Sequence, residues 1–100
     1  MDEFMAIYRI LRFLQCVIKC EEFPGKDFTS EHFKLGDFEF VALLEMLVNR
    51  GYIDGVGVKR SADGMIALSL STPRITLTGL EYLHGNEFMI KAAEQAKGRS

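Results

Sequence analysis

The sequence predicts a single domain of the α+β class, and three observations on its 100 residues carry that prediction. In the first half of the chain, hydrophobic residues recur every three or four positions, which is typical of amphipathic helices. From Tyr52 to Leu70 they alternate with small or polar residues instead, as in a β-hairpin. After the hairpin, residues typical of helix starts appear again. A chain of this length can bury one hydrophobic core without metal or disulfide support, which predicts a single domain.

The first helix is predicted by a single apolar face and is expected to run to about Cys20. That face consists of Phe4, Ile7, Tyr8, Leu11, Leu14 and Ile18. Pro24 and Gly25 then interrupt the helical pattern. A short second helix is expected in the segment EHFKL, with Thr29 or Ser30 as its N-cap.

The third helix is predicted from Asp37, which suits an N-cap, to Gly51, which suits the position after a helix. The residues expected to face the core are Phe40, Val41, Leu44, Leu47 and Val48. Those expected to face solvent are Glu39, Ala42, Glu45, Met46 and Asn49. This helix should be the centre of the core.

The hairpin is predicted by two alternating runs joined by turn residues. Tyr52, Val56 and Val58 mark the first run, and Ile66, Leu68 and Leu70 mark the second. Asp63 and Gly64 between them supply the turn.

Two helices are expected after the hairpin. Thr78 and Glu81 have the spacing of a capping box, so they should start a helix that ends at Gly85. Asn86 should cap the last helix, about residues 86–97, in which Glu87 and Lys91 form an i,i+4 pair.

The order of helix, helix, helix and hairpin is that of a winged helix, here a helix-turn-helix core of about residues 2–84 with a C-terminal helical extension. The segments LLEMLVNRGYIDGV and ITLTGLEYLHGNEFMIKAA resemble the YjcQ-like family, small winged-helix proteins of Gram-positive bacteria and their phages. The resemblance covers about residues 40–97 and implies the fold. It carries over no catalytic or binding residue, because the function of that family is itself poorly defined.

No spacing typical of a catalytic or metal site occurs in the sequence, so we expect a protein that is not an enzyme and has no cofactor. Cys16 and Cys20 stand four apart on the first predicted helix, and we expect reduced, buried thiols. His32 and His84 lie far apart in sequence, and His84 is interpreted as a helix C-terminal residue that contacts free carbonyls.

The first functional hypothesis is that the protein is a DNA-associated or regulatory module. The third helix suits it poorly, because its charges sum to −2 and would repel phosphate, although Asn49 could contact an adenine edge. The candidate contacts are therefore mostly the cations of the hairpin and its surroundings, Arg50, Lys59, Arg60 and Arg74, together with Asn49. Arg9, Arg12 and Lys19 form a further basic stripe on the first helix. Solubility alone would explain the hairpin cations as well.

Protein–protein interaction is the alternative hypothesis. The last helix has a face of small and apolar residues, Met89, Ala92, Ala93 and Ala96, with Phe88 near its edge. This face could join two copies in a homodimer, or it could pack back on the first helix. The acidic start MDEFMAIYR and the absence of a long apolar run predict a cytoplasmic protein without membrane contact.

Overall fold

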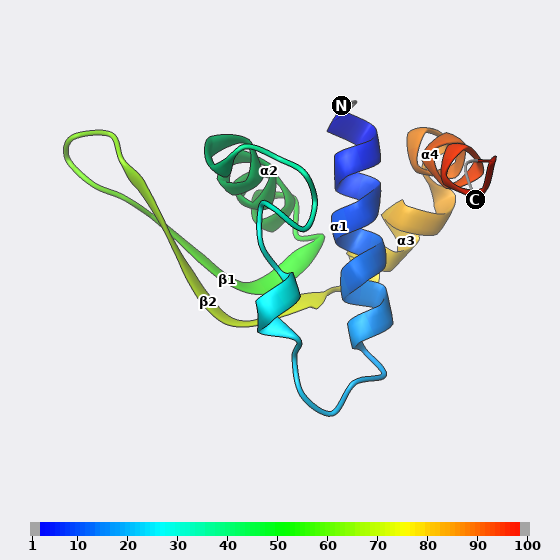
Figure 1. Ribbon diagram of the computed structural model, residues 1–100, viewed down its shortest axis with the longest axis horizontal. Coiled ribbons are helices and arrows are strands. Elements are labelled where there is room, and N and C mark those ends of the chain that lie inside the picture. Colours follow the sequence, from blue (N-terminus) through cyan, green and yellow to red (C-terminus); the bar gives the residue numbers. More distant parts are fainter. Residues whose placement is uncertain (1–2, 99–100) are drawn as a thin grey trace.

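The computed structural model describes residues 3–98, apart from the side chains of Arg60, Ile66 and Leu68. Its elements are α1 (Glu3–Val17), the 3₁₀ helix η1 (Gly25–Asp27), α2 (Asp37–Asn49), β1 (Ile53–Arg60), β2 (Ile66–Ile75), α3 (Leu77–Gly85) and α4 (Glu87–Gly98). Helix α1 lies in the middle, with α2 and the hairpin on one side and α3 and α4 on the other (Figure 1). The fold is α+β, as predicted, with a small winged-helix-like arrangement.

The central position of α1 explains why its buried surface is broader than one predicted face. The buried residues are Met5, Ala6, Ile7, Ile10, Leu11 and Leu14. The helix ends at Val17 rather than at Cys20, and Ile18 beyond it is exposed. Backbone bonds to the third preceding residue, such as Cys20 N–H to the Val17 carbonyl at 2.9 Å, replace the helical pattern there.

The second helix expected in EHFKL does not form. Residues 29–34 adopt turns instead, in which the Leu35 amide donates to the Ser30 carbonyl at 2.9 Å, and the Thr29 hydroxyl accepts from the His32 amide at 3.2 Å. Lys34 has a φ of 58°, which is incompatible with a continuing helix. Burial of Phe33 with the rings of Phe13, Phe23, Phe28 and Phe40 holds this segment in place.

Helix α2 spans the predicted segment, although Gly36 rather than Asp37 occupies the N-cap position. The Ser30 hydroxyl donates to an Asp37 carboxylate oxygen at 2.6 Å, which ties the start of α2 to the turn before it. The buried residues of α2 are Phe40, Leu43, Leu44 and Leu47. Val41 and Val48 are half-buried, so the predicted face is correct except that Leu43 is more central than Val41.

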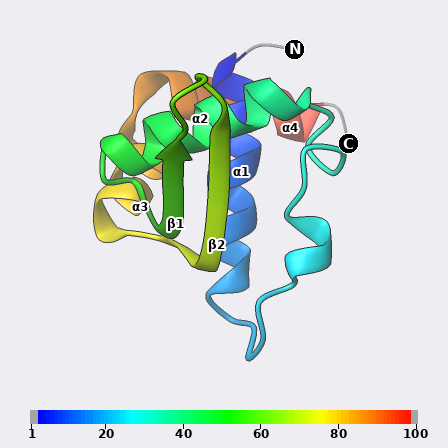
Figure 2. The ribbon, with the colours of Figure 1, turned by 90° about the vertical axis from the view of Figure 1, so that its left-hand side faces the viewer.

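The hairpin forms as predicted, and its antiparallel strands lie side by side in front of α1 and α2 in Figure 2. The register shifts between Asp54 and Val56, where Gly55 has a φ of +78°. A Cβ on Gly55 would stand 2.0 Å from the Thr72 carbonyl oxygen, so this bulge requires glycine. At the tip the Ser61 amide donates to the Met65 carbonyl at 2.8 Å.

The two sequence segments that resemble the family meet at the base of the hairpin. The Thr76 hydroxyl donates to the Gly51 carbonyl at 2.5 Å and accepts from the Gly79 amide at 3.0 Å. A Cβ on Gly79 would lie 2.1 Å from the Tyr52 carbonyl oxygen, so α3 approaches the α2–β1 turn closely. Thr76 is therefore the N-cap of α3, and the predicted capping pair of Thr78 and Glu81 is wrong.

A stacked pair of tyrosines completes this base. The rings of Tyr52 and Tyr82 lie 4.4 Å apart and nearly parallel. Burial raises the pKa of the Tyr82 phenol, Tyr52 adds to the rise, and the Arg50 guanidinium opposes it. The phenol is thus neutral at physiological pH and serves packing.

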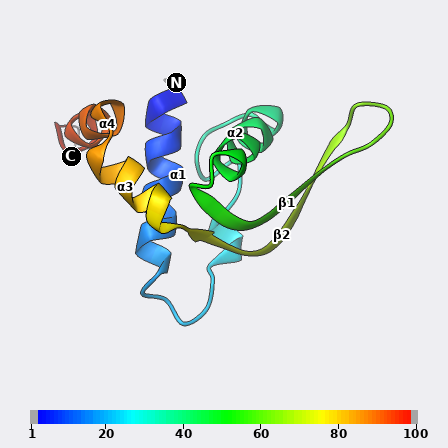
Figure 3. The same ribbon diagram turned by 180° about the vertical axis from the view of Figure 1, so that it is seen from behind.

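Helix α4 packs against α1, as the view from behind shows (Figure 3). Asn86 caps it as predicted, accepting from the Phe88 amide at 2.8 Å, and the expected pair of Lys91 and Glu87 forms at 3.4 Å. The Phe88 ring is half-exposed and stacks on Phe4 at 4.4 Å. Across residues 3–98, no helix is both long and apolar enough to cross a membrane.

Candidate functional site

The solvent side of α2 carries a stripe of apolar side chains. Phe38, Ala42 and Met46 are four residues apart and therefore share one side of the helix. Phe38 is 90% exposed and Met46 is 55% exposed. The opposite side of α2 is buried in the core, and this packing holds the helix and its exposed stripe in place.

Acidic groups border this stripe. Glu39 is exposed next to Phe38, and Asp37 lies in the same first turn. Glu45 is half-buried rather than exposed as predicted, while Asn49 is exposed at the end of the helix. The exposed side of α2 therefore combines apolar contact area with negative charge.

The predicted DNA contacts are exposed where the structure describes them, but they do not form one cluster. Arg50 is the C-cap of α2, and its positive charge opposes the rise that burial causes in the pKa of the Tyr82 phenol. Arg74 pairs in register with Asp54 near the hairpin base, whereas Lys59 pairs with Ala67 in the outer half. At the usual strand rise, Lys59 and Arg74 are roughly 15 Å apart. The side chain of Arg60 lies outside the described part of the structure.

The predicted partner face of α4 is largely covered by the chain itself. Met89 is fully buried in the core around α1, and Ala92 is also buried, so neither is available to a second molecule. Ala93 is half-buried and Ala96 is exposed. The amphipathic pattern of α4 is therefore explained by the packing of its apolar side on α1.

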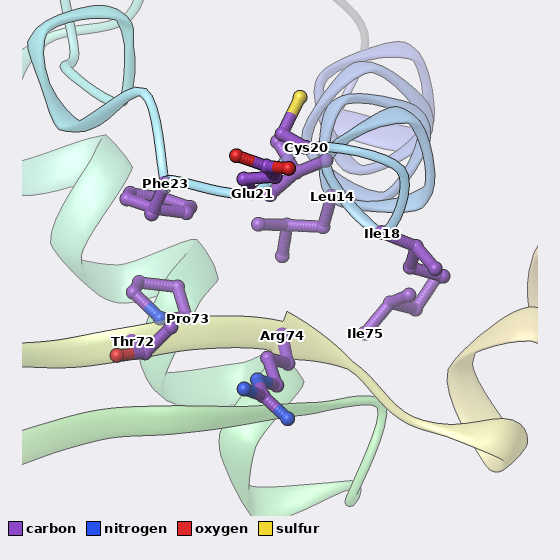
Figure 4. Close-up of a pocket in the computed structure, with 10 residues that line it drawn as sticks. Leu14, Ile18, Cys20, Glu21, Phe23, Thr72, Pro73, Arg74 and Ile75 are labelled. Atoms are coloured by element: carbon purple, nitrogen blue, oxygen red, sulfur yellow. The ribbon is translucent and has the colours of Figure 1, made fainter.

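A cavity of about 370 Å³ lies between the end of α1 and β2 (Figure 4). Leu14, Ile18, Pro73 and Ile75 provide apolar walls. The Arg74 side chain extends toward β1, away from Leu14, and the Cys20 sulfur points away from β2. The polar groups around this cavity do not converge on a common point. Cys16 and Cys20 are both exposed, so the expected burial of these thiols is wrong.

A second cavity, shallow and widely open to solvent, lies beside α1 and has a volume of about 390 Å³. Arg9 and Arg12 of the predicted basic stripe line it together with His32. Lys19, the third member of that stripe, lies beyond the end of α1 and does not line the cavity. Within residues 3–98, no group of three histidine, cysteine or acidic side chains is placed to hold a metal ion.

Sequence reasoning missed Phe38 and His32. The spacing of Phe38 to Ala42 and Met46 was a usable signal, because it continues the predicted solvent stripe by one helical turn. The signal for His32 was weaker, since only the folded turn brings residues 29–34 against α1.

Comparison with known proteins gives one finding. The family model described as YjcQ protein matches residues 8–98, which includes most of the N-terminal third that the quoted segments do not cover. Neither the search of curated proteins nor the search of solved structures found a match.

Proposed function

The chain belongs to the YjcQ family, and we propose that it is a non-catalytic winged-helix module that binds a protein partner through the exposed side of α2. The observation that carries this proposal is the 90% exposure of Phe38 on a helix whose opposite side is buried in the core, with Ala42 and Met46 in line with it. Aromatic side chains in such positions act as anchors that insert into a partner's pocket. Duplex DNA offers no comparable pocket on its phosphate backbone.

The charge next to the stripe defines the partner further. Glu39 is exposed on the same side of the helix beside Phe38, and within residues 3–98 it forms no ion pair. A matching surface is an apolar groove with lysine or arginine at its margin. The same carboxylate would repel a phosphate backbone, which is why α2 is a poor reading helix for DNA.

Site-specific cross-linking in cells that carry the natural gene tests this proposal. Photoreactive benzoylphenylalanine at position 38 should give a discrete adduct with another protein. The matched control is position 77, because Leu77 is 78% exposed but lies on α3. The same adduct at both positions, no adduct, or an adduct with a second copy of the chain would overturn the proposal.

With the partner purified, the chemistry of the groove can be tested directly. Phe38→Ser should weaken the complex by at least about tenfold, which corresponds to the loss of a hot-spot side chain. Glu39→Lys should weaken it most at low salt, where screening is least. Thermal unfolding of both variants should match the original protein, because both positions are exposed.

Weak DNA contact through the hairpin is the second candidate, and one observation favours it. Lys59 shares a hairpin face with Gly57, Ser69 and Ala67, and these small side chains would let a phosphate backbone approach closely. Binding to random duplex DNA at low and moderate salt tests it. The double variant Lys59→Ala with Arg74→Ala should reduce the slope of log binding constant against log salt by about two units. An unchanged slope would show that these hairpin residues do not contact phosphate.

A further inference from the structure

The cavity beside α1 joins positive charge to aromatic rings. Arg9 and Arg12 are three residues apart on α1 and line the cavity together with His32, which comes from the turn between η1 and α2. Phe13 and Phe33 form the apolar part. In Figure 1 the segment before α2 runs between α1 and α2, while the hairpin extends away from this region. The cavity is therefore separate from the hairpin and from the exposed stripe of α2.

Arg12 is the charge at the centre of this region. Its guanidinium donates to the Gln15 side-chain oxygen at 2.8 Å and to the Cys16 sulfur at 3.6 Å, both uncharged groups. Over residues 3–98, no carboxylate lies within ion-pair distance of Arg12. The charge is thus oriented by neighbours that do not neutralise it, which is the state that an anion site requires.

The rings beside Arg12 form an edge-to-face cluster. The His32 ring centre lies 5.5 Å from that of Phe13 and 5.0 Å from that of Phe33. Phe33 is buried and Phe13 is half-buried, so they fix the position of the exposed His32 ring. An exposed flat ring on a fixed base is a surface on which a planar base can stack.

A neighbouring cavity extends the same surface across α1. It has a volume of about 320 Å³, and Arg12 lines both cavities. His84 and Lys97 line the neighbouring one, and the His84 ring nitrogen lies 2.9 Å from the Gln15 side-chain nitrogen. Gln15 therefore connects the Arg12 guanidinium to the His84 imidazole. The two cavities together hold basic side chains from three helices and from the turn before α2.

We propose that this Arg12-centred surface binds a phosphorylated compound that carries a nucleobase, with the phosphate against Arg12 and the base stacked on His32. The source of this chemistry is either a free nucleotide or a segment of single-stranded nucleic acid. The neighbouring cavity of about 320 Å³ provides room for a further phosphate beside His84. The proposal is independent of partner binding by α2, since the two surfaces share no residue.

Binding of adenosine monophosphate and of a fluorescent oligothymidylate, measured on the whole chain at low salt, tests the proposal. Arg12→Gln should weaken binding of whichever probe binds by about tenfold, the usual effect of losing one charge-assisted contact. Lys19→Gln is the matched control, because it removes the same charge beyond the end of α1 and outside both cavities. Its affinity should equal that of the original protein.

His32→Ala tests the stacking part separately. His32 is exposed, so the fold should survive, while nucleotide affinity should fall several-fold with the loss of the stacking ring. Nuclear magnetic resonance spectra should show the largest nucleotide-induced shifts at Arg12, Phe13 and His32.

The probes distinguish the two sources. Equal affinity for the mononucleotide and the oligonucleotide would identify a free nucleotide as the ligand. Tighter oligonucleotide binding, with a log–log salt slope of about 0.7 per phosphate contact, assigns a strand. Three results would overturn the proposal: no binding of either probe, equal losses in Arg12→Gln and Lys19→Gln, or inorganic phosphate competing as well as the nucleotide does.

Discussion

The base of the β-hairpin and its outer half belong to the same strands but are held in different ways. At the base, Ile53 and Ile75 pair in register and are both buried, and Gly79 lets α3 touch the backbone of Tyr52. In the outer half, Lys59 and its partner Ala67 are exposed, and Met65 at the tip is 68% exposed. The contrast teaches that the constraint on sequence lies where the hairpin joins the helices. The outer half is free to change as a contact surface.

The largest effect is expected at Gly79. Gly79→Ala should cost about 3 kcal/mol or more of unfolding free energy, because the added Cβ meets backbone atoms that cannot move alone. Urea unfolding measures this. Gly85→Ala in the same helix is the control and should be near neutral, since nothing lies within 4 Å of its Cβ position. Equal effects would show that α3 does not approach the turn as described.

Ile53→Ala, at the start of β1, should cost about 2–5 kcal/mol through lost burial and the cavity left behind. The matched variant is Ile90→Ala, whose side chain is partly exposed on α4 and should cost less than about 1 kcal/mol. Thermal unfolding of both measures the difference. A small loss for Ile53→Ala would mean that the base of the hairpin is not part of the core.

Thr76→Val should cost about 1–2 kcal/mol, because it removes the hydroxyl that caps α3 and bonds to the Gly51 carbonyl. Thr78→Val compares the cap suggested by sequence spacing with the observed one and should be close to neutral. Unfolding by denaturant measures both free energies. A larger loss for Thr78→Val than for Thr76→Val would show that Thr78 is the cap.

Met65→Ser, at the tip, should change the unfolding free energy by less than about 0.5 kcal/mol, because the Met65 side chain is 68% exposed to solvent. Calorimetry is a suitable measurement. A clear loss would show that the outer half contributes to folding after all.

The smallest effect is expected from the charge of Asp63. Hydrogen bonds from the Ser61 hydroxyl and the Met65 amide lower the pKa of this carboxyl below its ordinary value. Its contribution to stability is therefore complete above the unfolded pKa and is lost as pH falls through the lower folded pKa. A pH titration of the Met65 amide resonance should give a midpoint below that of an unfolded peptide. Asp63→Asn should abolish the titration.

Much of the fold could be predicted because its signals are local. The apolar period of α1 and α2, the turn at Gly64 and the cap at Asn86 each depend on residues within a few positions. The prediction was wrong where a distant contact competes with the local pattern. The turn at residues 29–34 packs aromatic rings instead of extending a short helix, and the cap of α3 is the threonine that also reaches Gly51.

The candidate surfaces divide in the same way. The acidic character of α2 and the basic stripe of α1 could be predicted, because charge is a property of the residues in each segment. The burial of Met89 and the gathering of Arg12, His32 and His84 around α1 could not, since their positions depend on packing between separate elements.

The sequence by itself determined the α+β class, the hairpin with its turn at Asp63 and Gly64, and the periodic faces of the helices, because these follow from backbone preferences and neighbouring side chains. Only the tertiary structure decided which of those faces remained exposed. A helix face is buried when another element covers it, as happens to Met89 where α4 packs on α1, and remains a surface when none does, as at Phe38. That choice depends on contacts between residues far apart in the chain, for which one sequence contains no local signal.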